Sequence, residues 1–215
     1  MKKVRIGIIG VGGMGQGHAE TMKKIEEAEL VAVCDCNENM AKEVAQKHGV
    51  ECFVDYRELI DSGIAEAIIV ATPHYFHPEI SIYAMEHGLH VLSEKPISVT
   101  VSQADKMVEA SKKTGKVFSV MYQMRNKGVF IVAKDLIEKG HLGEIQRTLL
   151  INPWYRSQAY YDSGSWRATW KGEGGGVLIN QAPHMIDIFT MLAGLPRKFQ
   201  AKVRTRLHNI EVEDE

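Results

Sequence analysis

A glycine-rich turn near the amino terminus has the residue types and spacing needed to cradle phosphates. An apolar run over residues 4–9, rich in β-branched residues, leads into a G-x-G-x-x-G motif, after which a helical pattern begins. The first glycine allows a tight turn, the second lets a pyrophosphate approach the backbone, and the third lets the helix pack closely on the strand. The free N–H groups at the helix start then face the phosphates. The motif contains Gly10, Gly12, Gly13, Met14 and Gly15. It predicts a dinucleotide site, and a glycine turn without a ligand is the alternative.

An aspartate follows the glycine-rich motif at the distance where dinucleotide-binding proteins have an acidic residue. Asp35 lies twenty residues after Gly15, at the end of a second apolar run over residues 30–34. A carboxylate at this place accepts hydrogen bonds from the adenosine ribose hydroxyls and repels a 2′-phosphate. The sequence therefore predicts NAD as the cofactor, with NADP less favoured.

Two short polar motifs follow later apolar runs, over residues 67–71 and 89–93. Ligands bind outside the carboxyl ends of the strands in open α/β sheets, so both motifs are expected beside the cofactor. The ammonium group of Lys95 could hydrogen-bond a substrate hydroxyl and lower the pKa of that hydroxyl or of a nearby histidine. A solvated lysine beside a turn proline is the alternative. The motifs comprise Thr72, Pro73 and His77, and Glu94, Lys95 and Pro96.

A histidine lies on an apolar helix that the pattern predicts over about residues 177–193. Asn180 precedes His184 by four residues, a spacing that places both on one helical face and lets the amide orient the imidazole or bind substrate. Asp187, one turn further on, could fix the ring or bond the backbone. An imidazole here could accept the proton of an alcohol while hydride leaves the same carbon. A satisfied core histidine is the alternative.

Alternating strand-like and helix-like segments in the first half would position these groups. The alternation indicates βαβ units in a parallel, doubly wound sheet, and the near-continuous apolar strands suit a sheet covered on both faces. Asn37, Pro78 and Thr100 stand at expected helix starts, and Gly49, Gly88 and Gly115 at expected helix ends. The expected strands are residues 4–9, 30–34, 51–54, 67–71, 89–93 and 117–121, and the expected helices are about 13–26, 38–48, 57–62, 76–87 and 101–114.

The pattern changes after residue 122. A helix is expected over 126–140 and strands over 144–151 and about 198–207, with an aromatic, irregular segment over 153–172. Because two strands alone are marginal, the second sheet looks incomplete. We therefore expect an α/β protein with a Rossmann domain over residues 1–122 and an incomplete α+β, open-sheet domain over 123–215.

Composition excludes several classes of protein. The 215 residues carry a net charge of −1 and contain no basic tail, so neither nucleic acid nor a membrane surface is expected as a partner. No apolar stretch approaches the roughly 20 residues of a membrane span, and no signal-peptide pattern is present, so we expect a cytoplasmic protein. Cys34, Cys36 and Cys52 are expected to be free thiols, and no Cys/His set has the spacing of a zinc site.

Taken together, these motifs resemble the glucose–fructose oxidoreductase, inositol dehydrogenase and rhizopine catabolism family (Gfo/Idh/MocA). The resemblance covers the whole chain in register. It includes the glycine turn, Asp35, Thr72-Pro73 with His77, Glu94-Lys95-Pro96, Trp166-Arg167, and Gly174-Gly175-Gly176 with His184 and Asp187.

The resemblance implies reversible NAD(P)-dependent oxidation of a sugar, cyclitol or related hydroxyl. Lys95 and His184 would flank the reacting carbon, and Trp166 and Arg167 would approach the nicotinamide or the substrate. Thr72, Pro73, His77, Glu94 and Pro96 would line the cofactor. The large sheet of the second domain would make dimer or tetramer contacts.

Two features depart from the family pattern. Asn180 replaces an aspartate, and an amide cannot stabilise an imidazolium with a full charge, so His184 would be a weaker base. Family members are also usually longer than this chain, which would leave a sheet edge and an apolar face exposed. The sequence leaves two other hypotheses. One is an NAD-dependent glycosidase of the same fold, and the other is a non-catalytic NAD-binding module or truncated remnant.

Overall fold

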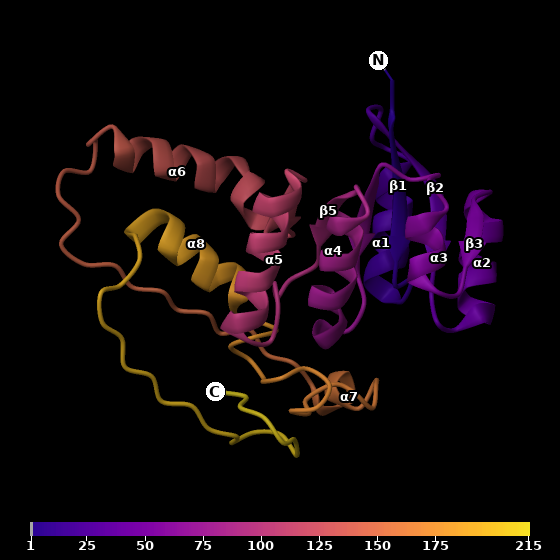
Figure 1. The fold of residues 1–215 in the computed structure, drawn as a ribbon. Coiled ribbons are helices and arrows are strands. Elements are labelled where there is room, and N and C mark those ends of the chain that lie inside the picture. Colours follow the sequence, from indigo (N-terminus) through magenta and orange to yellow (C-terminus); the bar gives the residue numbers. More distant parts are fainter. Residues whose placement is uncertain (1) are drawn as a thin grey trace. The chain divides into compact units, whose positions relative to one another are not determined.

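The computed structural model describes residues 2–215 and divides the chain into two compact units (Figure 1). Unit 1 ends at Met121 and unit 2 spans Tyr122–Glu215. Within the described part of the chain, no helix has the length and apolar character needed to cross a membrane.

Unit 1 is built on a six-stranded parallel sheet with the order β3-β2-β1-β4-β5-β6. This order is that of the dinucleotide-binding Rossmann fold, in which the direction of winding reverses beside the first strand. The expected doubly wound sheet is therefore confirmed. The strands are β1 (Val4–Ile9), β2 (Ala28–Cys34), β3 (Glu51–Phe53), β4 (Ala67–Val70), β5 (His90–Ser93) and β6 (Phe118–Val120).

Helices alternate with these strands, and α2 and α5 begin and end at the signals that the sequence contains, whereas the helix expected over about 13–26 ends at Met22. The Asn37 side chain caps α2 by accepting the Met40 N–H at 3.2 Å, and the Thr100 hydroxyl caps α5 in the same way. Gly49 and Gly115 end these two helices in the left-handed conformation, each with φ of 68°. The helices are α1 (Gly13–Met22), α2 (Glu38–His48), α3 (Tyr56–Asp61), α4 (His77–Glu86) and α5 (Val101–Thr114), with a 3₁₀ turn, η1, over His74–Phe76.

The core of unit 1 lies on both faces of the sheet. Ile8 packs on one face with buried residues of α1 and α2, and its neighbour Ile9 packs on the other face with buried residues of α3, α4 and α5. Successive side chains of a strand point to opposite faces, so a strand covered on both faces must be apolar throughout. Full burial of each such side chain contributes about 1.5–3 kcal/mol. This packing holds the carboxyl ends of the strands, where the candidate site lies.

Unit 2 is mainly helical and irregular in the described residues. Its elements are the 3₁₀ helix η2 (Gln123–Asn126), α6 (Gly128–Glu138), α7 (Gln158–Tyr161) and α8 (Pro183–Ala193). Helices α6 and α8 lie side by side, and η2 contacts both (Figure 1). A small core contains Tyr161, Ala168 and Val212, while α6 exposes Val129 and Val132.

Three predictions for unit 2 are wrong. Residues 144–151 and 198–207 are not strands, because a strand exists only through a paired neighbour and these two segments form no ladder with each other or with any described strand. The helix expected over 177–193 begins only at Pro183. The preceding residues form separate turns, and proline, which has no N–H, suits the first helical turn.

Candidate active site

The glycine turn between β1 and α1 has a backbone that larger residues could not follow. Gly10 has a φ of 87°, and a β-carbon there would lie 2.7 Å from the Ala71 carbonyl carbon. A β-carbon on Gly15 would overlap the Gly10 carbonyl oxygen, so α1 packs directly against the turn. By contrast, a β-carbon on Gly12 or Gly13 would meet no atom within 4 Å. The outer side of the turn is therefore open, and its shape fits a pyrophosphate lying against the start of α1.

Asp35, at the carboxyl end of β2, holds the glycine turn in place. Its Oδ2 accepts the Val11 N–H at 2.9 Å, and its Oδ1 accepts the Asn37 N–H at 2.9 Å. The Gly10 N–H donates to the Cys34 carbonyl at 2.8 Å. A carboxylate has about four acceptor positions, so Asp35 retains capacity for the hydroxyls of a ribose.

His77 joins the loops that follow β4 and β5. The ring is buried, with Nε2 2.8 Å from the Thr72 carbonyl oxygen and Nδ1 2.9 Å from the Pro96 carbonyl oxygen. Burial lowers the pKa of His77, and the two carbonyl acceptors offset part of that effect. His77 thus links the loop after β4, through Thr72, to the loop after β5, through Pro96, at the carboxyl ends of the strands.

Glu94 and Lys95 follow β5 at the same edge. The buried Glu94 carboxylate lies 2.8 Å from His18 Nε2 through Oε1, and its Oε2 accepts the Lys95 N–H at 3.1 Å. Burial alone would raise the pKa of Glu94, but the hydrogen bonds and charges of His18 and Lys95 outweigh it and lower that pKa. The ionised carboxylate therefore lies next to Lys95, whose peptide bond to Pro96 is cis.

In unit 2, Arg167 belongs to an aromatic and acidic cluster. Its guanidinium lies 4.5 Å from the Tyr160 ring centroid and 4.6 Å from that of Trp166, and it donates to the Tyr160 hydroxyl at 2.8 Å. The same guanidinium is 3.9 Å from a Glu173 carboxylate oxygen. These contacts hold Trp166 and Arg167 together as one group.

Glu173 is the buried acid of this cluster, with 1% of its side chain exposed. It accepts the Ala168 N–H at 2.6 Å and a hydrogen bond from the Asn180 amide. Asn180 lies in the turn before α8, so the expectation that it shares a helical face with His184 is wrong. The Asn180 NH₂ group is the donor of this bond, and the Oδ1 atom of the same amide is by its chemistry an acceptor.

His184 lies in the first turn of α8. The Tyr122 and His184 rings form a T-shaped pair, with centroids 5.9 Å apart and an interplanar angle of 85°. Asp187, one turn further along, is bound by Arg125, whose Nε and Nη2 donate to the two carboxylate oxygens at 2.7 and 2.6 Å. Burial, followed by the charge of Asp187, raises the pKa of Tyr122.

The structure thus gathers the predicted residues into two groups. The glycine turn, Asp35, Thr72, Pro73, His77, Glu94, Lys95 and Pro96 lie in unit 1, and Trp166, Arg167, Asn180 and His184 lie in unit 2. Sequence reasoning missed His18, Glu173, Tyr122 and Arg125, which contact members of these groups. Only Glu173, an acid directly before three glycines, carried a local signal.

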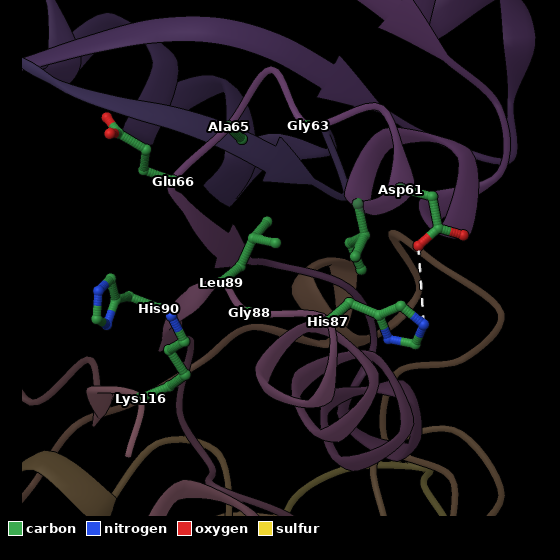
Figure 2. A pocket seen from close by; sticks show the side chains of 10 residues that line it. Asp61, Gly63, Ala65, Glu66, His87, Gly88, Leu89, His90 and Lys116 are labelled. Carbon is green, nitrogen blue, oxygen red and sulfur yellow. Dashed lines mark ion pairs between the residues drawn. The ribbon is translucent and has the colours of Figure 1, made fainter. Parts of the chain in front are cut away.

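A cavity of about 560 Å³ lies elsewhere in unit 1, at the amino ends of β4 and β5 (Figure 2). Asp61 and His87 face each other on one side of it, 3.9 Å apart, and Glu66, His90 and Lys116 also line it. Ligands of open α/β sheets bind outside the carboxyl ends of the strands, so this cavity at their amino ends lies outside the candidate site.

The fold, the glycine turn and Asp35 define unit 1 as a dinucleotide-binding Rossmann domain. Residues 4–122 match the oxidoreductase family with an NAD-binding Rossmann fold, GFO_IDH_MocA, and residues 130–215 match the GFO/IDH/MocA C-terminal domain. The chain belongs to the Gfo/Idh/MocA family.

Relatives with established names include a myo-inositol 2-dehydrogenase from Thermotoga maritima, 34% identical over 66% of this chain and 42% of its own length. An α-N-acetylgalactosaminidase from Shewanella oneidensis is 28% identical over 79% of this chain and 40% of its own length. The chain thus spans less than half the length of these relatives. The crystal structure of the WlbA dehydrogenase from Bordetella pertussis, in complex with NADH and UDP-GlcNAcA, covers 99% of this chain and 66% of its own length, with 32% identity and a TM-score of 0.93.

Proposed function

We propose that this protein is an NAD-dependent oxidoreductase that transfers a hydride between the nicotinamide and a carbon bearing a hydroxyl group in a sugar, a cyclitol or a related compound. The observation that carries the proposal is that the glycine turn, Asp35 and Lys95 follow the carboxyl ends of β1, β2 and β5, three strands of one parallel sheet. NAD, when bound, supplies the hydride acceptor or donor, while the residues of this chain bind, orient and move the proton.

Lys95 is assigned to the reacting oxygen. Its ammonium would hydrogen-bond the substrate hydroxyl or carbonyl oxygen and stabilise negative charge that develops there. His184 would accept the hydroxyl proton during oxidation and return it during reduction, which is general acid–base catalysis. The Oδ1 atom of Asn180 would accept a hydrogen bond from a substrate hydroxyl. Trp166 and Arg167 would border the nicotinamide or the substrate.

Asp35 would favour NAD over NADP. Its carboxylate is already oriented by two backbone N–H groups, so it is fixed where a ribose would lie. A 2′-phosphate would bring a second negative charge close to it, which costs about 1–4 kcal/mol per pair of unit charges near a protein surface.

We also propose that the protein works in the cytoplasm as a homo-oligomer, a dimer or tetramer. The three cysteines are free thiols in the described structure, which suits a reducing compartment. Exposed apolar side chains in unit 2, among them Leu149, Ile151 and Phe199, are of the kind that subunit contacts bury.

The test is turnover by the Lys95→Ala variant. NADH formation is followed with myo-inositol, glucose 6-phosphate and levoglucosan, and Lys106→Ala, which alters an exposed lysine of α5, is the matched control. Loss of an acid–base or oxyanion partner lowers rates by about 10²–10⁴-fold, whereas the control should match the parent. Full activity of Lys95→Ala would contradict the assigned role.

A glycosidase that retains NAD is the second candidate, because one relative bears the name of an α-N-acetylgalactosaminidase. In that case the purified chain would retain NAD and cleave a p-nitrophenyl glycoside without net NADH formation. A protein that binds NAD but shows neither activity would be a non-catalytic module.

A further inference from the structure

A pair of residues on α8 contacts a pair of residues on η2 and its cap. His184 and Asp187 are three residues apart on α8, and Tyr122 and Arg125 are three residues apart along η2 and its cap. A 3₁₀ helix has about three residues per turn, so Tyr122 and Arg125 share one side of η2. The Tyr122 and His184 rings form a T-shaped pair, and Arg125 binds the Asp187 carboxylate.

The Arg125–Asp187 pair is bidentate, which fixes orientation as well as position. The Asp187 side chain is 12% exposed and that of Arg125 is 51% exposed, so one partner is largely withdrawn from water. The Asp187 carboxylate raises the pKa of Arg125, which stays protonated throughout the working range of the protein. The negative charge on α8 next to His184 is therefore matched by a permanent positive charge.

On the described elements that contact α8, the charged side chains other than Arg125 pair among themselves or are exposed. The ionisable groups of α6 pair along that helix, Lys134 with Glu138 at 3.5 Å and Asp135 with Lys139 at 2.8 Å, and they are mainly solvent-exposed. Glu173, which binds Asn180 in the turn before α8, also contacts Ala168 and Arg167, and Lys127 at the start of α6 is exposed.

We propose that Arg125 is a positioning residue for His184. By binding both Asp187 carboxylate oxygens, its guanidinium fixes the face of α8 that carries the imidazole, and it neutralises the carboxylate one turn away from the ring. This inference rests on the proposed role of His184 as the proton acceptor. A base must alternate between its neutral and protonated forms, and an unpaired carboxylate nearby stabilises the protonated form. Arg125 prevents that bias, so the imidazole returns readily to the neutral state that accepts the next proton.

The test is an NMR titration of His184 in the 215-residue chain. The imidazole is assigned by its loss in His184→Asn, and its pKa is compared in the parent, Arg125→Gln, Asp187→Asn and the double variant. A unit charge one helical turn away in a partly hydrated site shifts a pKa by about 0.5–1 unit. We expect Arg125→Gln to raise the pKa of His184 by that amount, and the double variant to return it to the parent value. In Arg125→Lys, which keeps the positive charge but loses the bidentate geometry, the pKa of His184 should stay near the parent value.

Two outcomes would overturn the proposal. One is an unchanged His184 pKa in Arg125→Gln, and the other is an equal shift in Arg125→Gln and in the double variant, which would indicate a purely structural change. Far-UV circular dichroism checks that each variant is folded, and Asp187→Asn provides the comparison if Arg125→Gln does not fold. Activity is measured separately: an active His184→Asn would end the proposed function, whereas the titration would still decide whether Arg125 controls the charge beside His184.

Discussion

The substitution Gly15→Ala tests how closely α1 packs on the glycine turn. A β-carbon at this position would overlap the Gly10 carbonyl oxygen and lie 2.9 Å from its carbon and 3.5 Å from Ile8 Cγ2. A backbone carbonyl at the end of a buried strand cannot turn away as a flexible side chain can, so α1 itself must shift. Overpacking of this kind costs about 1–3 kcal/mol.

Gly17→Ala is the matched control in the same helix. Gly17 is exposed, and a β-carbon there would meet no atom within 4 Å. Replacing a helical glycine by alanine stabilises by about 0.5–1 kcal/mol, a gain that both variants share. We therefore expect Gly17→Ala to raise the free energy of unfolding and Gly15→Ala to lower it by about 0.5–2.5 kcal/mol.

Urea unfolding followed by far-UV circular dichroism measures both changes, and NADH titration measures their effect on binding. Gly15→Ala should also weaken NADH binding, because the start of α1 faces the phosphates. All three tryptophans lie in unit 2, so their fluorescence supplies a separate probe of that unit. Equal stability and equal NADH affinity of the two variants would refute the close-packing argument.

Three further predictions concern the acids. Asp35→Asn should improve NADPH binding relative to NADH by about tenfold, or about 1.4 kcal/mol, as measured by paired titrations, and an unchanged ratio would contradict its assigned selectivity. Glu94→Gln should be less stable than the parent at neutral pH, because the folded-state pKa of Glu94 is lowered. The stabilisation from a lowered carboxyl pKa is fully present above the unfolded-state value, near 4.5, and is lost as pH falls through the folded-state value, so the difference in unfolding free energy should shrink from pH 6 towards pH 3. A pH-independent difference would count against the ionised Glu94. Glu173→Gln should destabilise unit 2 by about 1–3 kcal/mol, measured by urea unfolding, because an NH₂ group would replace an acceptor facing buried donors, and a neutral effect would show that the carboxylate charge is dispensable there.

The features of unit 1 that sequence predicts correctly depend on local chemistry. The β-branched runs predict the strands, and Asn37, Gly49, Thr100 and Gly115 mark helix ends because their side chains or backbone freedom act within a few residues. The glycine spacing predicts the turn for the same reason. Each of these signals is present in a short stretch of chain.

The features that sequence misses depend on long-range contacts. His18 and Glu94 are 76 residues apart, and Arg125 and Asp187 are 62 apart, so no spacing rule joins them. The strands expected in unit 2 fail for a related reason, because alternation of apolar residues indicates a strand only where a neighbour completes the hydrogen-bond ladder. The sequence places Asn180 on the helix because its apolar helical pattern begins before α8 does. The helix itself starts at Pro183, three residues after Asn180.

The most direct test of the central claim is a fluorescence titration of the 215-residue chain with NADH and, in parallel, NADPH. Saturable binding with clearly tighter affinity for NADH is the predicted result, because the glycine turn accepts the pyrophosphate and Asp35 accepts the ribose hydroxyls without tolerating a 2′-phosphate. Equal or tighter binding of NADPH would contradict the role of Asp35. No binding of either nucleotide would contradict the account of the glycine turn as the cofactor site.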